Sequence, residues 1–188
     1  MCRGNDVNVV NPNLYIISGG PGSGKTTVLQ ELERLGYSCV PEVARAIIQE
    51  QMQSGGTAVP WADRETYTQL MLERSIQSFL GHTPALTPTF SDRGIPDTLC
   101  YMRLVGLTGL ETIRTVCERY RYARIVFLAP PWQEIYTTDT ERKQDFAEAV
   151  RTFGLMREVY EELRYQVVEL PKLPSISRAR FILSELEE

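Results

Sequence analysis

Five short apolar stretches, bounded by glycine, proline or charged residues, have the pattern of buried β-strands. They lie at Leu14–Ser18, Ser38–Glu42, Thr89–Asp92, Arg124–Ala129 and Tyr165–Leu170. The stretches between them show helical periodicity instead, with apolar residues recurring at three- and four-residue spacing. Helices are therefore expected from Lys25, from Val43, from an N-cap at Asp63, over Asp97–Val105 and Thr108–Tyr122, over Phe146–Leu163, and from an N-cap at Ser177.

This alternation predicts an α/β fold of three layers, in which about five parallel strands carry helices on both faces. The length of 188 residues suits a single domain over residues 1–188, and the polar residues 1–12 are expected to form a loose N-terminal segment.

The composition, 43% hydrophobic and 23% charged, is that of an ordinary soluble domain. A net charge of -4 argues against a broad nucleic-acid-binding surface, which needs a basic excess. No apolar run reaches the roughly 18 residues that span a membrane, and the polar N-terminus lacks the apolar core of a signal peptide. We therefore expect a cytoplasmic protein that binds neither nucleic acid nor membrane. The irregularly spaced cysteines predict reduced thiols, and with a single histidine they give no zinc-binding pattern.

A glycine-rich loop separates the first predicted strand from the first predicted helix. Its letters, GGPGSGKT at residues 19–26, match GxxxxGK(S/T) without a mismatch. Glycines let consecutive backbone N–H groups point at a phosphate, and the helix N-terminus adds positive potential. The predicted nucleotide-binding residues are Gly19, Gly20, Pro21, Gly22, Ser23, Gly24, Lys25, Thr26 and Thr27. Lys25 would reach the β- and γ-phosphates, and the Thr26 hydroxyl would ligate Mg²⁺. The alternatives are a plain strand-to-helix turn or a dinucleotide-binding loop, which has no place for the GKT ending.

A phosphate-binding loop of this kind serves kinases, motors, switches and regulators alike. A ring-forming motor usually needs a longer chain, and a GTPase needs an NKxD tetrapeptide, which this sequence lacks. These observations favour ATP as the nucleoside triphosphate.

The motif Ser91-Asp92-Arg93-Gly94 stands where the third strand should end, at the edge of the sheet where ligands bind. Asp92 would hold Mg²⁺ through water or accept a proton from a substrate hydroxyl. Arg93 would steady a phosphate or a substrate carboxylate. The alternative is a turn in which Asp92 caps the next segment and Arg93 pairs on the surface.

Glu42 and Arg45, in the sequence PEVAR, follow the second strand toward the same edge. Glu42 would bind a hydroxyl or amide of a second substrate, and Arg45 would supply charge. Alternatively, Glu42 is an acidic residue placed to suit a helix dipole.

The polar segment Thr137–Asp145 has the pattern of a lid over the γ-phosphate, with Arg142 preferred to Lys143 as the cation that stabilises charge during transfer. The alternative is a solvated helical turn whose charges pair with one another.

Several other residues have weaker signals. Tyr101, Met102 and Leu104 either line an acceptor pocket or pack in the core. Pro171–Pro174 would border the nucleotide base, and Arg178 and Arg180 either lie near that base or are surface arginines, which is the commoner case. Trp61 fits a packing or surface position.

Taken in order, GGPGSGKTT, PEVAR, SDRG, ERK and VVELP resemble a family of small P-loop ATPases or kinases with an AAA-type domain. The chain is similar to the nicotinamide-riboside kinase domain of bifunctional NAD-biosynthesis regulators, and more distantly to thymidylate and deoxynucleoside kinases. The resemblance implies a P-loop NTPase fold whose first strand is central, an acidic group at Asp92, a lid arginine at Arg142, and Glu42 and Arg45 near an acceptor. It implies a kinase that transfers the ATP γ-phosphoryl to a small hydroxyl-bearing acceptor with Mg²⁺; the alternative is an ATPase switch or binding module without an acceptor.

Overall fold

The computed structural model of the chain describes residues 8–135 and 146–187. Its main sheet has five parallel strands in the order β3 (Ser38–Val40), β4 (Thr89–Asp92), β2 (Leu14–Gly19), β6 (Ile125–Ala129) and β7 (Gln166–Glu169). The strand before the glycine-rich loop, β2, is central, with Ile16 and Ile17 fully buried. The predicted α/β architecture, with five parallel strands and β2 in the middle, is confirmed.

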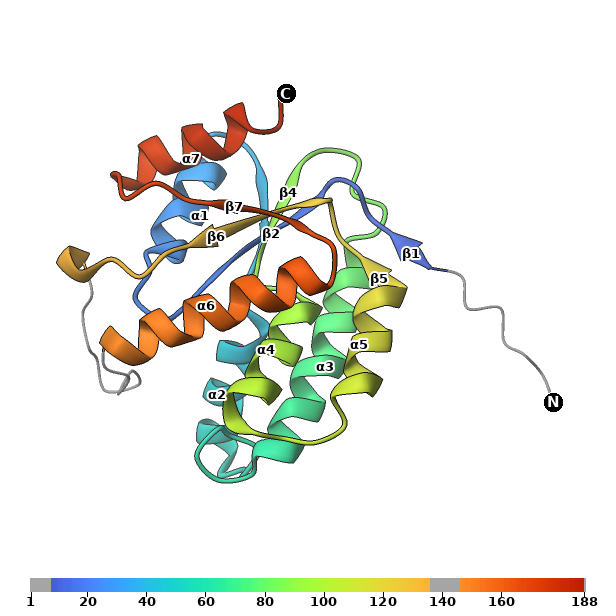
Figure 1. Cartoon of the computed structure of the whole chain (residues 1–188). Coiled ribbons are helices and arrows are strands. Elements are labelled where there is room, and N and C mark those ends of the chain that lie inside the picture. The colour runs from blue at the N-terminus through green and yellow to red at the C-terminus, as the bar shows by residue number, and fades with distance from the viewer. Residues whose placement is uncertain (1–7, 136–145, 188) are drawn as a thin grey trace.

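Helices cover both faces of this sheet (Figure 1). One face carries α1 (Lys25–Arg34) and α7 (Ser175–Ser184). The other side holds α3 (Arg64–Gly81), α4 (Ile95–Val105), α5 (Leu110–Arg119) and α6 (Phe146–Glu162), with α2 (Val43–Ser54) packed on α3. A short 3-10 helix, η1 (Gln133–Ile135), follows β6. Within the described ranges, no helix combines the length and the hydropathy that crossing a membrane requires.

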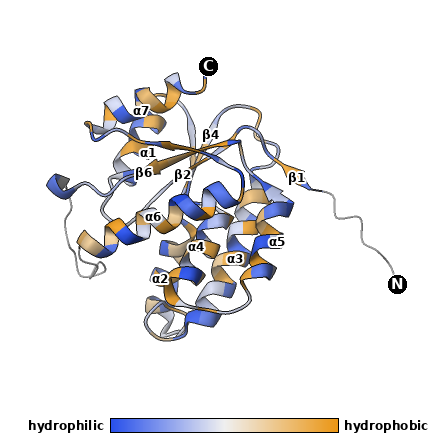
Figure 2. Ribbon diagram, in the orientation of Figure 1, coloured by the Kyte–Doolittle hydropathy of each residue, from blue (hydrophilic) through white to orange (hydrophobic). Residues whose placement is uncertain are grey.

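Two hydrophobic clusters hold the layers together, and the central strands β2 and β6 are among the most hydrophobic elements in Figure 2. Phe90 and Phe127 are buried with α1 and α7 on one face. Phe79 and Tyr160, from α3 and α6, are buried on the other. The sheet is therefore covered on both faces.

A small second sheet was not expected from the sequence. Within residues 1–12, predicted to be loose, β1 (Val9–Val10) pairs in parallel with β5 (Tyr120–Arg121). Next to β1, Asn11 is fully buried and its Nδ2 donates to the carbonyl oxygen of His82 at 2.8 Å. The described end of this segment is therefore part of the folded domain, because its backbone and amide groups have partners.

Several element boundaries differ from the predicted ones. The second strand ends at Val40, since Pro41 has no N–H to continue a ladder. The helix expected from Asp97 begins at Ile95, and the one expected through Tyr122 ends at Arg119. The last helix begins at Ser175 after Pro174, so Ser177 lies inside it and is not its cap. These errors lie at helix and strand ends, where local propensities are weakest.

Candidate active site

The glycine-rich loop joins the carboxyl end of β2 to the N-terminus of α1. Gly19, Gly22 and Gly24 adopt φ angles of 143°, 73° and 80°, which favour glycine. A Cβ atom at Gly19 would lie 2.5 Å from the carbonyl oxygen of Ala129 on β6. The loop conformation therefore requires glycine at this point, both for its backbone angle and for the close approach of β6.

Lys25 is buried under the loop that precedes it. Its Nζ donates to the carbonyl oxygens of Gly19, at 2.8 Å, and Gly20, at 3.1 Å. Burial, followed by repulsion from Arg93, lowers the pKa of Lys25 to about 8, although Asp92 and Glu42 oppose this shift. The ammonium group is thus held by neutral carbonyls, and phosphate oxygens would be stronger acceptors.

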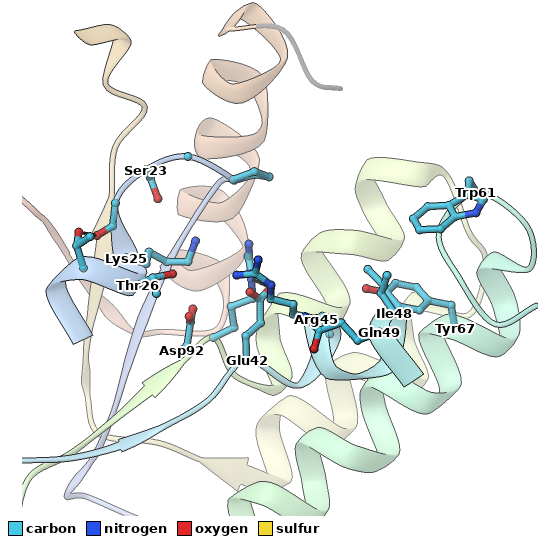
Figure 3. Close-up of a pocket in the computed structure, with 16 residues that line it drawn as sticks. Ser23, Lys25, Thr26, Glu42, Arg45, Ile48, Gln49, Trp61, Tyr67 and Asp92 are labelled. Carbon is cyan, nitrogen blue, oxygen red and sulfur yellow. Dashed lines mark hydrogen bonds and ion pairs between the residues drawn. The ribbon is translucent and has the colours of Figure 1, made fainter. Parts of the chain in front are cut away.

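Two hydroxyls from the predicted nucleotide-binding set brace the loop itself. Ser23 Oγ donates to the carbonyl oxygen of Gly20 at 2.8 Å. Thr27 Oγ1 donates to the carbonyl oxygen of Gly24 at the same distance. Thr26, which lies between these two residues in the sequence, has an exposed side chain that lines the cavity in front of the loop (Figure 3).

Asp92 ends β4, as its position in the sequence predicts. It is buried, and its Oδ1 has no hydrogen-bond partner among the described residues. Burial raises the pKa of Asp92, against the attraction of Lys25. Asp92 lines the same cavity as Lys25 and Thr26, and the three side chains gather at the strand ends in Figure 3.

Arg93 lies in the left-handed region, with φ of 69°, and reaches toward two carboxylates. Its Nε donates to Glu42 Oε1 at 2.7 Å, and its Nη1 donates to Asp97 Oδ1 at 3.3 Å. Burial favours neutral Glu42, but Arg93 and then Lys25 outweigh it and hold the pKa of Glu42 below its usual value. Glu42 and Arg93, which the sequence places after two different strands, therefore form an ion pair.

Asp97 is a site residue that sequence reasoning missed. Its carboxylate accepts hydrogen bonds from Ser18 Oγ at 2.5 Å, Tyr160 OH at 2.6 Å and the Gly94 N–H at 2.8 Å. Asp97 therefore ties β2, α4 and α6 to Arg93. Its only local signal was an acidic residue in the first turn of a helix, which is common for other reasons.

Several cavities open at the strand ends, and the two largest of those found there share residues of the predicted site. The first, of about 570 Å³, is lined by Pro21, Gly22, Ser23, Gly24, Lys25, Thr26, Thr27, Glu42, Ala44, Arg45, Ile48, Gln49, Trp61, Tyr67, Asp92 and Arg93. Trp61 and Tyr67 lie across it from Lys25 (Figure 3), so Trp61 belongs to the cavity although its pattern suggested packing or plain surface. The structure thus brings together the loop with Glu42, Arg45, Asp92 and Arg93.

The second cavity, of about 550 Å³, lies between α3, α4 and α6 and shares Glu42, Tyr67 and Arg93 with the first. The sequence did not decide whether Tyr101, Met102 and Leu104 line a pocket or pack in the core. Tyr101 and Leu104 line this cavity, and Met102 packs in the core.

Three further arginines from the sequence analysis have different outcomes. Arg142, with the whole segment Thr137–Asp145, lies outside the described residues. The surface interpretation of Arg178 is wrong: this residue is 3% exposed, and its Nη1 donates to the Ser23 carbonyl oxygen at 2.9 Å. Arg180, two residues on, is exposed as predicted.

Comparison with known protein families assigns this chain to one of them. A model of the AAA domain matches residues 14–178. The chain belongs to the AAA domain family. No curated protein sequence matches this AAA domain closely enough to count as a relative.

Three solved structures share the fold of this AAA domain. Thymidylate kinase from Ehrlichia chaffeensis is 16% identical, with a TM-score of 0.62 over 95% of this chain and 100% of that one. The NadR protein in complex with NR is 18% identical, with a TM-score of 0.66 over 93% of this chain and 50% of that one. Shikimate kinase from Acinetobacter baumannii in complex with shikimate is 18% identical, with a TM-score of 0.53 over 94% and 93%. The expected resemblance is confirmed, and the AAA domain has the fold of P-loop kinases.

Proposed function

We propose that this AAA domain is a small-molecule kinase, which transfers the γ-phosphoryl group of ATP to a hydroxyl-bearing acceptor with the help of Mg²⁺. The observation that carries the proposal is the second cavity, which opens beside the phosphate-binding loop and shares Glu42, Tyr67 and Arg93 with the first. A hydrolytic switch needs space for a nucleotide and water only. A cavity of about 550 Å³ has the size of a small-molecule site.

On the nucleotide side, the backbone N–H groups of the loop and the Lys25 ammonium would bind the phosphates. Magnesium prefers hard oxygen ligands, keeps several waters and needs one or two protein oxygens in addition to phosphate. Asp92 fits this requirement because its buried Oδ1 has no hydrogen-bond partner within residues 8–135 and 146–187, and the exposed Thr26 hydroxyl lines the same cavity. The described residues hold no cluster of three or more acidic, histidine or cysteine ligands, so they favour a phosphate-assisted site over a dedicated cage. The ion, when bound, would neutralise phosphate charge.

On the acceptor side, the second cavity combines apolar walls with polar groups that lack partners. Leu155 and Met156 supply apolar surface, whereas Tyr101 OH and Thr152 Oγ1 are buried without a hydrogen bond among the described residues. Buried hydroxyls without partners are costly, and an acceptor that carries hydroxyl or amide groups would satisfy them. Glu42, held in place by Arg93, stands where the two cavities join.

The transfer itself needs little covalent chemistry from the protein. The acceptor oxygen forms a bond to the γ-phosphorus as the bond from that phosphorus to the β–γ bridging oxygen breaks, and ADP leaves with the electron pair. Asp92 was predicted either to hold Mg²⁺ or to accept the proton of the acceptor hydroxyl. In the second role, with the ion held by Thr26 and phosphate oxygens, the proton would pass to the Asp92 carboxylate, whose pKa burial raises. Lys25 lies against the loop, so it is positioned to stabilise the charge that develops on the transferred group.

A screen for phosphate transfer from radiolabelled ATP tests the proposal. Nucleosides, nucleotides and vitamins would be offered to the wild-type chain and to Lys25→Ala as the matched blank. We expect a labelled product that depends on both the acceptor and Lys25. Release of labelled phosphate to water alone, whatever acceptor is present, would instead favour the nucleotide-dependent switch.

A further inference from the structure

Arg178 is a buried cation that the proposed reaction does not use. It lies on α7, which packs against α1, the helix that follows the phosphate-binding loop. Its Nη1 donates to the carbonyl oxygen of Ser23, and its buried Nε has no hydrogen-bond partner in the part of the chain that the structure describes. None of the described acidic side chains forms an ion pair with it. Burial alone shifts its pKa, and it does so downward, which fits a charge without an acidic neighbour.

The contact fixes one peptide plane of the loop. In a trans peptide, the C=O of one residue and the N–H of the next point in opposite directions. The only cis peptide bond among the described residues joins Thr83 to Pro84, so the Ser23–Gly24 bond is trans. Because Arg178 holds the Ser23 carbonyl on the α7 side, the Gly24 N–H is turned the other way. Gly24, at φ of 80°, is the N-cap of α1 and lines the cavity in front of the loop.

The other described side chains that donate to carbonyl oxygens of the loop belong to the loop itself or to α1, the helix that follows it. Lys25 and Ser23 hold the carbonyl oxygens of Gly19 and Gly20 from within the same turn. Arg178 is 155 residues away from Ser23 in the sequence. It therefore connects the loop to the C-terminal helix, on the opposite side of the sheet from the acceptor cavity.

We propose that Arg178 is a positioning residue for nucleotide phosphates: it aims the Gly24 N–H at them, and their negative charge compensates its own. This inference rests on the nucleotide half of the proposed function and is independent of the acceptor. A buried charge without a counter-charge is unfavourable, so an anion that arrives on the far side of the loop relieves a cost that the free chain bears. Binding of polyphosphate and docking of α7 then stabilise each other, since coupling between two sites is reciprocal.

The experiment compares Arg178→Met, which removes the charge but keeps a long apolar side chain, with Arg178→Lys, which keeps the charge but loses the planar donor group. Arg180→Met, on the exposed side of the same helix, is the matched control. Isothermal titration calorimetry measures the Kd of each chain for MgATP, for inorganic tripolyphosphate and for adenosine. Circular dichroism checks that each variant is folded.

We expect Arg178→Met to weaken binding of MgATP and of tripolyphosphate about tenfold or more, as for loss of a charged hydrogen bond. Adenosine binding should stay unchanged, Arg178→Lys should fall between wild type and Arg178→Met, and Arg180→Met should match wild type. Addition of ATP should also raise the melting temperature of Arg178→Met less than that of the wild-type chain.

Other outcomes overturn the inference. A folded Arg178→Met that binds MgATP and tripolyphosphate like wild type refutes it, and so does an equal loss for adenosine, which indicates general damage to the domain. If Arg178→Met does not fold, the same titrations on Arg178→Lys test the inference. A wild-type affinity of Arg178→Lys for MgATP and tripolyphosphate then refutes the role of the planar guanidinium. A wild-type chain that binds ATP but phosphorylates no acceptor contradicts only the kinase proposal. A wild-type chain that binds no ATP contradicts both the kinase proposal and the role of Arg178.

Discussion

The buried ammonium of Lys25 predicts a specific pH dependence of ATP binding. In the free chain its pKa is about 8, lowered first by burial and then by Arg93. Bound polyphosphate would raise this pKa, because an opposite charge at close range favours the protonated form. Binding above pH 8 therefore takes up a proton, and affinity must fall as the pH rises.

The magnitude follows from the fraction of Lys25 that carries a proton. With a pKa of about 8, about nine tenths of the free chain is protonated at pH 7 and about one tenth at pH 9. If the bound form stays protonated throughout, the apparent Kd for MgATP rises about tenfold between these pH values. Below pH 7 this group contributes little further change.

Isothermal titration calorimetry across this range, in buffers with different ionisation enthalpies, measures both the Kd and the proton uptake. Two neighbours provide controls of opposite sign. Glu42 raises the pKa of Lys25, so Glu42→Gln should move the fall in affinity to lower pH. Arg93 lowers it, so Arg93→Gln should move the fall to higher pH. A wild-type affinity that is flat from pH 7 to pH 9, with no proton uptake, contradicts a Lys25 pKa of about 8 in the free chain.

Further changes test other parts of the site. Lys25→Ala should abolish tight MgATP binding in calorimetry, and unchanged affinity would remove the nucleotide assignment. Asp92→Asn should leave ATP binding largely intact but slow turnover by about 10²–10⁴-fold, as for loss of a proton acceptor; wild-type turnover excludes Asp92 from the mechanism. Tyr101→Phe and Thr152→Val should each raise the KM of the acceptor up to about tenfold and leave the KM of ATP alone; if neither does, the acceptor does not contact these hydroxyls. Asp97→Ala should lower the free energy of unfolding in urea by about 3–5 kcal/mol, because it removes the carboxylate that pairs with a buried arginine; a change below about 1 kcal/mol contradicts this.

The conformation of the glycine-rich loop could be predicted from the sequence because the loop is local. A strand, a run of glycines and a helix are contiguous, so the backbone angles and the helix N-terminus follow from neighbouring residues. Asp92 was also placed correctly, at the end of β4. Parallel strands share a carboxyl edge, so its position at a strand end was enough to bring it near Lys25.

The second cavity could be predicted only in part. Tyr101 and Leu104 face it and Met102 does not, because the turn of α4 decides which side chains meet the core. Thr152 comes from α6, far along the chain, and gave no signal, since a threonine inside a helix has many ordinary roles.

From the sequence alone, one can predict the parallel α/β fold, the glycine-rich loop before α1 and the acidic group beside it. Tertiary packing was needed to show that Arg93 pairs with both Glu42 and Asp97, and that Arg178 donates to the Ser23 carbonyl instead of lying on the surface. The physical reason is that a charge acquires its role from what surrounds it. An arginine on an amphipathic helix looks the same in sequence whether its guanidinium reaches water or a backbone carbonyl, and the packing of α7 on α1 makes that choice.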